Sequence, residues 1–289
     1  MKGVFRVLGG LLVVIVSGRL VFAQTADIDS IVAREMSARR IPGVAIAVVE
    51  DHRITFERAY GTSNLETQTP LRADAVFELA SVTKQFTAAA VMMLVEEGKV
   101  GLDEPIARYL DETPESWKEI TVRRLLTHTG GLEIASLPIV EGSPPLNVTT
   151  QAAFDYVSKL PLRFPPGQEG WYSDAGYFLL GMIIEKASGE SYREFMQREI
   201  FEPLGMSQSS ILDKSRVLLG RVPTYSLRDG VHVNWRRDWD FELPSFFGIF
   251  STLRDLAKWD DSLRDATLLS GEGLAQMWTP ANVSNGNRA

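Results

Sequence analysis

Two different spacings of apolar residues organise the first part of the chain. Between residues 27 and 40 the apolar positions recur every three to four residues, which predicts an amphipathic helix. Residues 44–49 are all apolar, as is typical of a buried strand. Residues 54–60 alternate between apolar and polar positions, and Gly61 is expected to end this second strand. The pattern predicts a helix followed by a two-stranded hairpin.

An apolar run from residue 86 to residue 95 predicts a buried helix that ends at Gly98. Ser81 and Lys84 come just before this run, so we expect both in the first turn of the helix. At a spacing of three, their side chains share one face and can contact each other. The four-residue pattern alone also fits an ordinary N-cap Ser followed by a solvated Lys.

The chemistry of this pair is that of an activated nucleophile. Unpaired backbone N–H groups at the start of a helix can stabilise an oxyanion formed at Ser81. Burial of Lys84 would favour a neutral amine, which can accept the Ser proton.

The rest of the chain is read more coarsely. Helical patterns occupy residues 121–126, 151–160, 175–187, 192–201 and 253–263, with Thr121 and Ser251-Thr252 as N-terminal caps. Residues 137–150 are rich in proline and are expected to form a loop, and residues 221–244 are expected to be irregular.

Composition narrows the class of partner. The 289 residues are 45% hydrophobic and 23% charged, which is typical of a globular protein with a large core. The net charge of −7 argues against nucleic acid as a partner. The absence of cysteine excludes disulfides, thiol catalysis and Cys-ligated metals.

The N-terminus has the pattern of a signal peptide. Lys2 and Arg6 precede a short apolar stretch at residues 7–16, and Val21-Phe22-Ala23 offers a cleavage site before Gln24. We therefore expect residues 1–23 to be removed and the protein to be periplasmic or secreted. The alternative is an uncleaved anchor, and Arg19 disturbs the region before the cleavage site. No later run is long and apolar enough to cross a membrane.

Several segments agree in order and spacing with one known family. They are Phe77 to Lys84, Leu102-Asp103-Glu104-Pro105, Leu125 to Leu132, Pro166-Gly167, Tyr172 to Tyr177, Pro203-Leu204-Gly205-Met206 and Ser251 to Trp259. From about residue 27 onward the chain resembles the β-lactamase-related serine hydrolases, which include class C β-lactamases, D-Ala-D-Ala carboxypeptidases, D-aminopeptidases and family VIII esterases.

The resemblance implies an α/β fold of the α+β type, with an antiparallel sheet flanked by helices and an inserted helical part. Residues 24–72 would form the N-terminal helix and hairpin, 73–250 the helical part, and 251–289 a helix and the start of a C-terminal segment. Ser81 would be the nucleophile, Lys84 its partner, and Tyr172 a phenolate base or proton relay. No cofactor or metal is implied, and an alternative for Tyr172 is an ordinary packed aromatic.

One residue departs from the family pattern inside the site. The family's Y-x-N box has Asn where this chain has Asp174. Asn can donate an N–H to a substrate amide, whereas an ionised Asp only accepts. Asp174 beside Lys84 would also favour the charged ammonium, which shifts the role of base to Tyr172. Esters are therefore favoured over D-amino-acid peptides and β-lactams. The alternative is that Asp174 only caps the following helix.

A second departure concerns the family's third box, K-T-G or H-x-G on a strand beside the Ser. No Lys is followed by Thr-Gly, and His128-Thr129-Gly130 belongs to a mid-chain motif that we interpret as a structural turn. We therefore expect a chain that lacks the C-terminal strands and the second oxyanion donor, with weak activity and a tendency to self-associate.

The sequence motifs of other hydrolase classes are absent. There is no G-x-S-x-G elbow and no H-E-x-x-H motif, and His52, His128 and His232 are scattered. The alternative function is a catalytically impaired remnant that binds peptidoglycan-like or β-lactam ligands without turnover. Trp171, Trp235 and Trp239 either wall a substrate cleft or pack as ordinary aromatics. The expected partner is a small-molecule or peptidoglycan-derived substrate, and the pattern does not fix an oligomeric state.

Overall fold

The computed structural model describes residues 25–133, 147–213, 215–235 and 240–284. Its first element is α1 (Thr25–Arg39), followed by β1 (Gly43–Glu50) and β2 (Arg53–Asn64). The predicted helix and hairpin are confirmed. Residues 1–23, the predicted signal peptide, and most of the predicted loop at 137–150 lie outside the described residues.

Strands β1 and β2 pair antiparallel from Gly43 opposite Gly61 to Glu50 opposite Arg53, and β3 (Thr69–Pro70) pairs with the far end of β2. The prediction that β2 ends at Gly61 is wrong. Gly61 has φ 75°, and a Cβ there would lie 2.2 Å from the carbonyl oxygen of Pro42. Glycine thus lets the strand bend past a close backbone contact and continue to Asn64.

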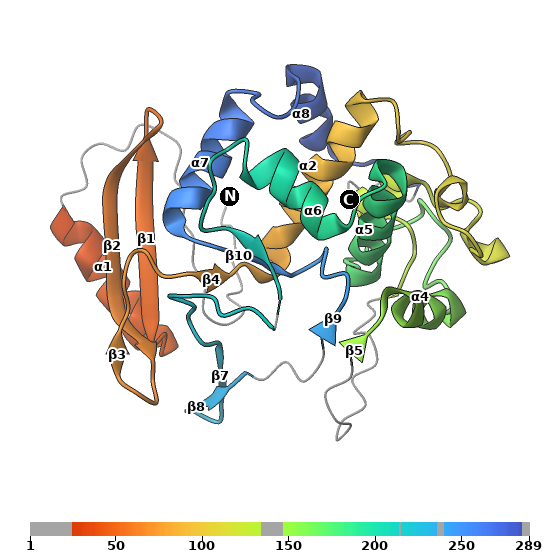
Figure 1. Cartoon of the computed structure of the whole chain (residues 1–289). Coiled ribbons are helices and arrows are strands. Elements are labelled where there is room, and N and C mark those ends of the chain that lie inside the picture. The colour runs from red at the N-terminus through yellow and green to blue at the C-terminus, as the bar shows by residue number, and fades with distance from the viewer. Residues whose placement is uncertain (1–24, 134–146, 214, 236–239, 285–289) are drawn as a thin grey trace.

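Helices cover both faces of this sheet (Figure 1). On one face, Arg58 and Tyr60 of β2 both bond the carboxylate of Asp29 in α1. On the other face, Ala45 and Ala47 of β1 pack in a small cluster with Leu253, the first residue of α7 (Leu253–Arg264). The side chains of a strand alternate between faces, so the continuous apolar run of β1 fits a strand that is covered on both sides.

The larger core lies in the helical part and is centred on α2 (Thr83–Glu96) and α5 (Asp174–Ser188). Phe86 of α2 is fully buried and stacks on Trp259 of α7 with ring centroids 4.1 Å apart. The remaining helices surround this pair: α3 (Val122–Leu126), α4 (Thr150–Lys159), α6 (Tyr192–Met196) and α8 (Gly271–Met277). Short 3-10 turns at Ile106–Arg108 and Glu115–Trp117 link α2 to α3.

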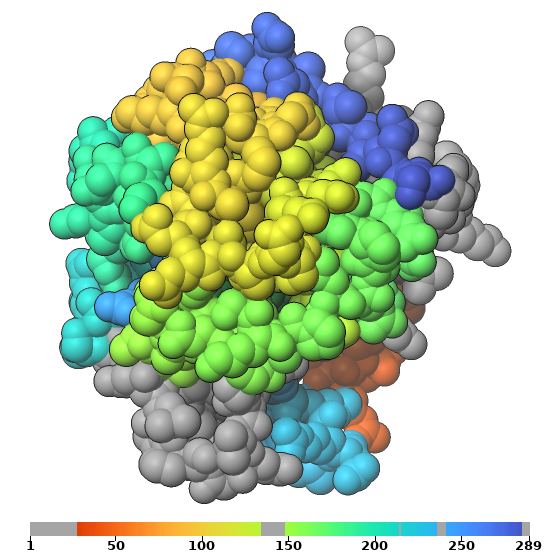
Figure 2. Space-filling view, turned by 90° about the vertical axis from the view of Figure 1, so that its right-hand side faces the viewer, coloured from red at the N-terminus to blue at the C-terminus, as the bar shows by residue number. Residues whose placement is uncertain are grey.

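Most of the predicted helices are present, with small changes at their ends. Thr121 and Thr252 are N-caps, as predicted, and accept hydrogen bonds from Arg124 and Asp255 backbone N–H groups. The helix predicted at 192–201 is α6 continued by one π-helical turn, Gln197–Phe201. In Figure 2 the middle of the chain, coloured yellow to green, forms the surface of the helical side, and the blue C-terminal part lies above it.

Short strands complete the fold. β10 (Ile249–Ser251) pairs with both β4 (Phe77–Glu78) and β6 (Ser210–Ile211), and β5 (Asn147–Val148) pairs with β9 (Asp240–Phe241). The prediction that 221–244 is irregular is wrong, because β7 (Tyr225–Arg228) and β8 (Val231–Asn234) form a hairpin. Asp229 and Gly230 at its turn both have positive φ, as an Asp-Gly type I′ turn requires.

Within the part of the chain that the structure describes, no helix has the length and apolarity needed to cross a membrane. The domain boundaries at residues 72 and 250 stay a prediction.

Candidate active site

Ser81 lies in a 3-10 turn, Ala80–Val82, that leads directly into α2. We expected it inside the first turn of α2. The difference arises at Ala80, whose φ of 47° is in the left-handed region that residues other than glycine rarely adopt. The hydrogen bonds of the turn are donated by the backbone N–H groups of Val82 and Thr83. The N–H of Ser81 comes one residue earlier, so the turn does not use it. The Ser81 side chain is exposed.

Lys84 is in the first turn of α2, as predicted, and is 6% exposed. Its Nζ lies 3.2 Å from Ser81 Oγ and 2.9 Å from the backbone oxygen of Phe246, and both of these atoms accept hydrogen bonds. The third neighbour is Asp174 Oδ1, 2.7 Å away. Lys84 Nζ therefore donates two hydrogen bonds and has a carboxylate oxygen as its third close neighbour.

Tyr172 contacts both Ser81 and Lys84. Its hydroxyl lies 2.7 Å from Ser81 Oγ, and its ring lies 4.8 Å from Lys84 Nζ. The side chain is 45% exposed. The two hydroxyls and the amine predicted from the sequence are therefore within contact distance, with Tyr172 and Ser81 open to solvent and Lys84 beneath them.

Asp174 is the first residue of α5, but it does not cap that helix. The N-cap is Ser173, whose Oγ accepts the N–H of Gly176. The alternative interpretation of Asp174 as a helix cap is thus wrong, because its carboxylate faces Lys84. Oδ1 has no hydrogen bond of good geometry among the described residues, so the contact with Lys84 is an ion pair.

Residues 245–249, which are remote in sequence, hold the start of α2 and the Lys84 side chain in place. The backbone oxygen of Phe246 accepts from Lys84, and the backbone oxygen of Ser245 accepts from the Thr87 hydroxyl. The Ile249 N–H donates to Thr83 Oγ1 at 3.1 Å. Sequence reasoning missed these partners, since a backbone carbonyl leaves no mark in the sequence.

His128 is in the turn after α3, where its φ is 58°. The structure confirms a turn at the mid-chain His-Thr-Gly motif, but it also brings the His128 ring next to Tyr172, at 4.7 Å between centroids. Burial, followed by the positive charge of Lys84, lowers the pKa of His128 to about 4, while Asp174 acts in the opposite direction.

Ser81 lines a cleft of about 730 Å³. Its walls come from the ends of β1 and β2 and from the β7–β8 hairpin, which contributes Tyr225, Leu227 and Trp235. Of the three tryptophans considered as cleft walls, Trp235 lines this cleft and Trp171 packs under the guanidinium of Arg163 at 3.6 Å. Trp239 lies outside the described residues.

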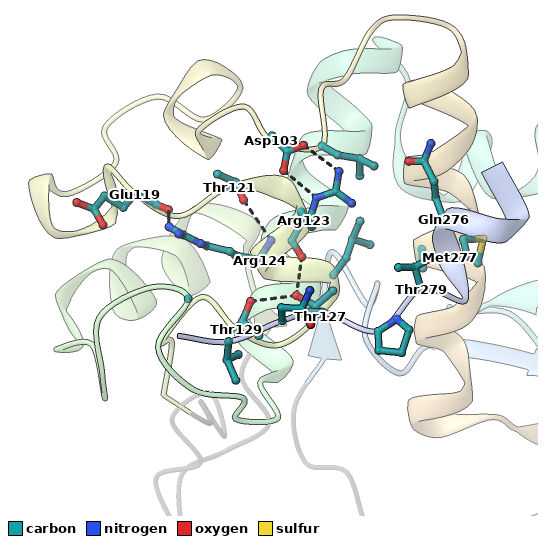
Figure 3. A pocket seen from close by; sticks show the side chains of 18 of the residues that line it. Asp103, Glu119, Thr121, Arg123, Arg124, Thr127, Thr129, Gln276, Met277 and Thr279 are labelled. Carbon is teal, nitrogen blue, oxygen red and sulfur yellow. Dashed lines mark hydrogen bonds and ion pairs between the residues drawn. The ribbon is translucent and has the colours of Figure 1, made fainter. Parts of the chain in front are cut away.

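A second, larger cavity of about 980 Å³ lies between α3 and residues 276–284, and Ser81 does not line it (Figure 3). Its polar groups are largely paired with one another. Arg123 makes two hydrogen bonds to the carboxylate of Asp103, Arg124 donates to the backbone oxygen of Glu119, and Thr127 contacts Thr129. Ser81 lines the smaller cleft and does not line this cavity. Among the described residues no group of three or more His, Asp or Glu side chains could hold a metal ion.

Comparison with known proteins gives consistent results. A family model described as "Beta-lactamase" matches residues 28–288. Esterase EstB of Burkholderia gladioli is 31% identical over 230 residues, which cover 72% of this chain and 58% of that protein. The chain spans about half to three fifths of the length of the curated relatives that it matches.

Two solved structures show the same architecture. The octameric penicillin-binding protein homologue from Pyrococcus abyssi has a TM-score of 0.78 and 29% identity, covering 89% of this chain and 60% of that one. D-amino acid amidase from Ochrobactrum anthropi SV3, complexed with L-phenylalanine, has a TM-score of 0.70 and 27% identity, covering 83% and 71%.

Proposed function

The chain belongs to the beta-lactamase family, and from that premise we propose that it is a serine hydrolase that acts through an acyl-enzyme on Ser81. The observation that carries the proposal is the contact of Ser81 Oγ with two groups that can move its proton, the Tyr172 hydroxyl at 2.7 Å and Lys84 Nζ at 3.2 Å. A serine hydroxyl is a weak nucleophile unless such a base is in reach.

Tyr172, as its phenolate, takes the proton of Ser81 Oγ while Oγ forms a bond to the carbonyl carbon of the substrate. The tetrahedral intermediate collapses, the bond to the leaving oxygen breaks, and Tyr172 returns the proton to that oxygen. Water then attacks the acyl carbon while the Tyr172 phenolate takes one of its protons. The bond between the acyl carbon and Ser81 Oγ breaks, and Tyr172 returns that proton to Oγ. The N–H of Ser81 at the start of the helical segment supplies one donor for the oxyanion.

Lys84 is proposed as the positive charge that makes this possible. Its ammonium lies 4.8 Å from the Tyr172 ring and is held by Asp174 and the carbonyl of Phe246. An ammonium has no lone pair to accept the Ser81 proton, but its charge can stabilise negative charge that develops on the Tyr172 oxygen. The base is therefore assigned to Tyr172, and Lys84 to charge stabilisation and orientation of Ser81.

We propose esters as the preferred substrates. The Asp174 carboxylate cannot donate a hydrogen bond to an amide carbonyl, whereas an ester needs no such donor. The similar proteins include an esterase and a D-amino acid amidase, so enzymes named for ester bonds and for amide bonds both occur among them. Residues 1–23 have the pattern of a signal peptide, which supports export to the periplasm or the medium.

The test is covalent labelling with a fluorophosphonate probe, followed by peptide mapping. We expect labelling at Ser81, hydrolysis of p-nitrophenyl butyrate faster than that of nitrocefin, and loss of both activities in Ser81→Ala. Tyr172→Phe and Lys84→Ala should each reduce kcat by about 10²–10⁴-fold. If both variants retain more than a tenth of the activity, Ser81 is not activated in this way.

The ion pair between Lys84 and Asp174 favours one alternative, a catalytically impaired remnant that binds peptidoglycan-like or β-lactam ligands without turnover. Such a protein would bind a fluorescent penicillin reversibly and would give no covalent adduct with either probe. Export is tested separately by N-terminal sequencing of the mature protein, where a start at Gln24 is expected.

A further inference from the structure

His128 contacts the backbone on both sides of Tyr172. Its carbonyl oxygen accepts the N–H of Trp171 at 2.8 Å, and its ring nitrogen Nδ1 accepts the N–H of Ser173 at 3.1 Å. One residue thus holds the backbone N–H groups of the two residues on either side of Tyr172. The left-handed backbone of His128, at φ 58°, allows its carbonyl and its ring to reach the same segment. Histidine is among the residue types that tolerate this region.

The ring of His128 also supports the phenol from below. It contacts the rings of both Tyr172 and Tyr177, with centroid distances of 4.7 Å and 5.1 Å and interplanar angles of 34° and 35°. Tyr177 is itself fixed, because it is 6% exposed and its hydroxyl donates to the Leu126 carbonyl at 3.0 Å. His128 thus joins a fixed tyrosine ring to the ring whose hydroxyl contacts Ser81.

We propose that His128 is a positioning residue that holds the Tyr172 phenol against Ser81, and that it does so as a neutral imidazole with its proton on Nε2. The inference rests on the proposed function, since it assigns His128 a role in placing the proposed base. Nδ1 must be unprotonated to accept the Ser173 N–H, so the other nitrogen carries the proton.

The surroundings of His128 support the neutral form. Lys84 and Asp174 are the charged groups that act on the ring, and Tyr172 and Tyr177 flank it. Burial and the Lys84 charge hold the pKa of His128 near 4, so the acceptor on Nδ1 persists over the neutral pH range.

Two variants separate the contributions of the ring and of Nδ1. His128→Phe keeps an aromatic ring but leaves the Ser173 N–H without its acceptor. His128→Asn removes the ring but places an amide oxygen at the corresponding branch position, and Asn also tolerates positive φ. A misplacement of about 1 Å can cost about 10²-fold in rate. We expect kcat for p-nitrophenyl butyrate to fall by about that factor in His128→Phe with KM nearly unchanged, and to recover partly in His128→Asn.

A double-mutant cycle with Tyr172→Phe gives a readout that a merely structural role would not move. If His128 acts through the phenol, His128→Asn should have little further effect on kcat once Tyr172 is Phe. Thermal unfolding of each variant shows whether it is folded. If His128→Phe does not fold, the cycle is completed with His128→Asn alone.

The outcomes distinguish the two proposals. An unmutated protein that is not acylated at Ser81 overturns the proposed function. An acylated protein whose folded His128 variants keep the original kcat overturns only the positioning role. The same holds if the effects of His128→Asn and Tyr172→Phe on kcat are simply additive, since His128 would then act independently of the phenol.

Discussion

Asp174 is a single residue that changes both the charge and the hydrogen-bonding character of the site. Replacing it with Asn removes the ion pair with Lys84 and adds an N–H donor next to the substrate. A hydrogen bond involving a charged or polar partner contributes about 1–3 kcal/mol. We therefore predict that Asp174→Asn raises the ratio of kcat/KM for nitrocefin to that for p-nitrophenyl butyrate by about 10–100-fold.

The matched control is Asp174→Ala, which removes the ion pair but adds no donor. Equal ratios in the Ala and Asn variants would show that the loss of the carboxylate, and not the new donor, changes the preference.

His128 has a consequence for the pH dependence of stability. Its folded pKa of about 4 is lower than the value near 6.5 of an unfolded chain, so between these pH values the unfolded state binds more protons. The His128 contribution to the free energy of unfolding thus falls as pH drops from 6.5 to 4, by up to about 3 kcal/mol. A His128→Asn variant keeps the charged or titratable neighbours of this ring, which are Lys84, Asp174, Tyr172 and Tyr177. A comparison with that variant therefore isolates the contribution of His128.

The measurement is urea unfolding at pH 7 and at pH 4.5 for the unmutated protein and for His128→Asn. We expect the variant to lose less stability than the unmutated protein over this interval. An identical loss in both would show that His128 is not held neutral by the fold.

At the scale of elements, Gly181 determines how closely α5 approaches the segment that binds Lys84. A Cβ at Gly181 would lie 2.3 Å from Ser245 Oγ and 2.6 Å from Ser245 Cβ. Overpacking of this kind typically costs about 1–3 kcal/mol. We predict that Gly181→Ala destabilises the protein by this amount in urea unfolding and also lowers kcat, because Ser245 precedes the Phe246 carbonyl that accepts from Lys84.

Gly271, at the start of α8, is the matched control. A Cβ there meets nothing within 4 Å, so Gly271→Ala should leave activity unchanged and stability equal or slightly higher. A Gly181→Ala protein as stable and active as Gly271→Ala would mean that the helix and the Ser245 segment are not in tight contact.

Elements with their own periodicity could be predicted from the sequence. Helices α2, α5 and α7 carry long apolar repeats, α5 and α7 also have side-chain N-caps, and β1 is a continuous apolar run. The β7–β8 hairpin was missed although Asp229-Gly230 is a turn signal, because its strands are only four residues long. Strands of two or three residues, such as β4 and β10, exist only through their partners and carry no local pattern.

The residues of the candidate site also differ in how far they could be predicted from the sequence. The spacing of Ser81 and Lys84 could be read locally, and Tyr172 and Asp174 came from the resemblance to a family. The Phe246 carbonyl and the contacts of His128 could not be predicted, because a backbone acceptor and a buried ring acquire their roles only when distant segments meet.

At the scale of the whole molecule, β1 is an edge strand among the described residues. It pairs with β2 on one side, and no described strand pairs with its other edge. It contains no Pro or Lys, the residues that commonly protect an edge. We predict concentration-dependent self-association in sedimentation velocity, and a shift toward monomer in Val48→Lys.

Thr55→Lys is the control, because it adds the same charge at an exposed position of β2. It should leave the association unchanged. A monomer at every concentration, or equal effects of the two lysines, would show that the β1 edge does not mediate the contact.

The Lys84 cluster joins parts of the chain that are far apart in sequence. Tyr172 is 91 residues from Ser81, and Phe246 is 162 residues from Lys84. Contacts of such long sequence separation form late, because the entropy of closing large loops must be overcome first. During refolding, the helical circular-dichroism signal should therefore return before Ser81 becomes reactive toward a fluorophosphonate. The rate at which Ser81 becomes labelled would then measure the rate of the last folding step, in which the native topology forms.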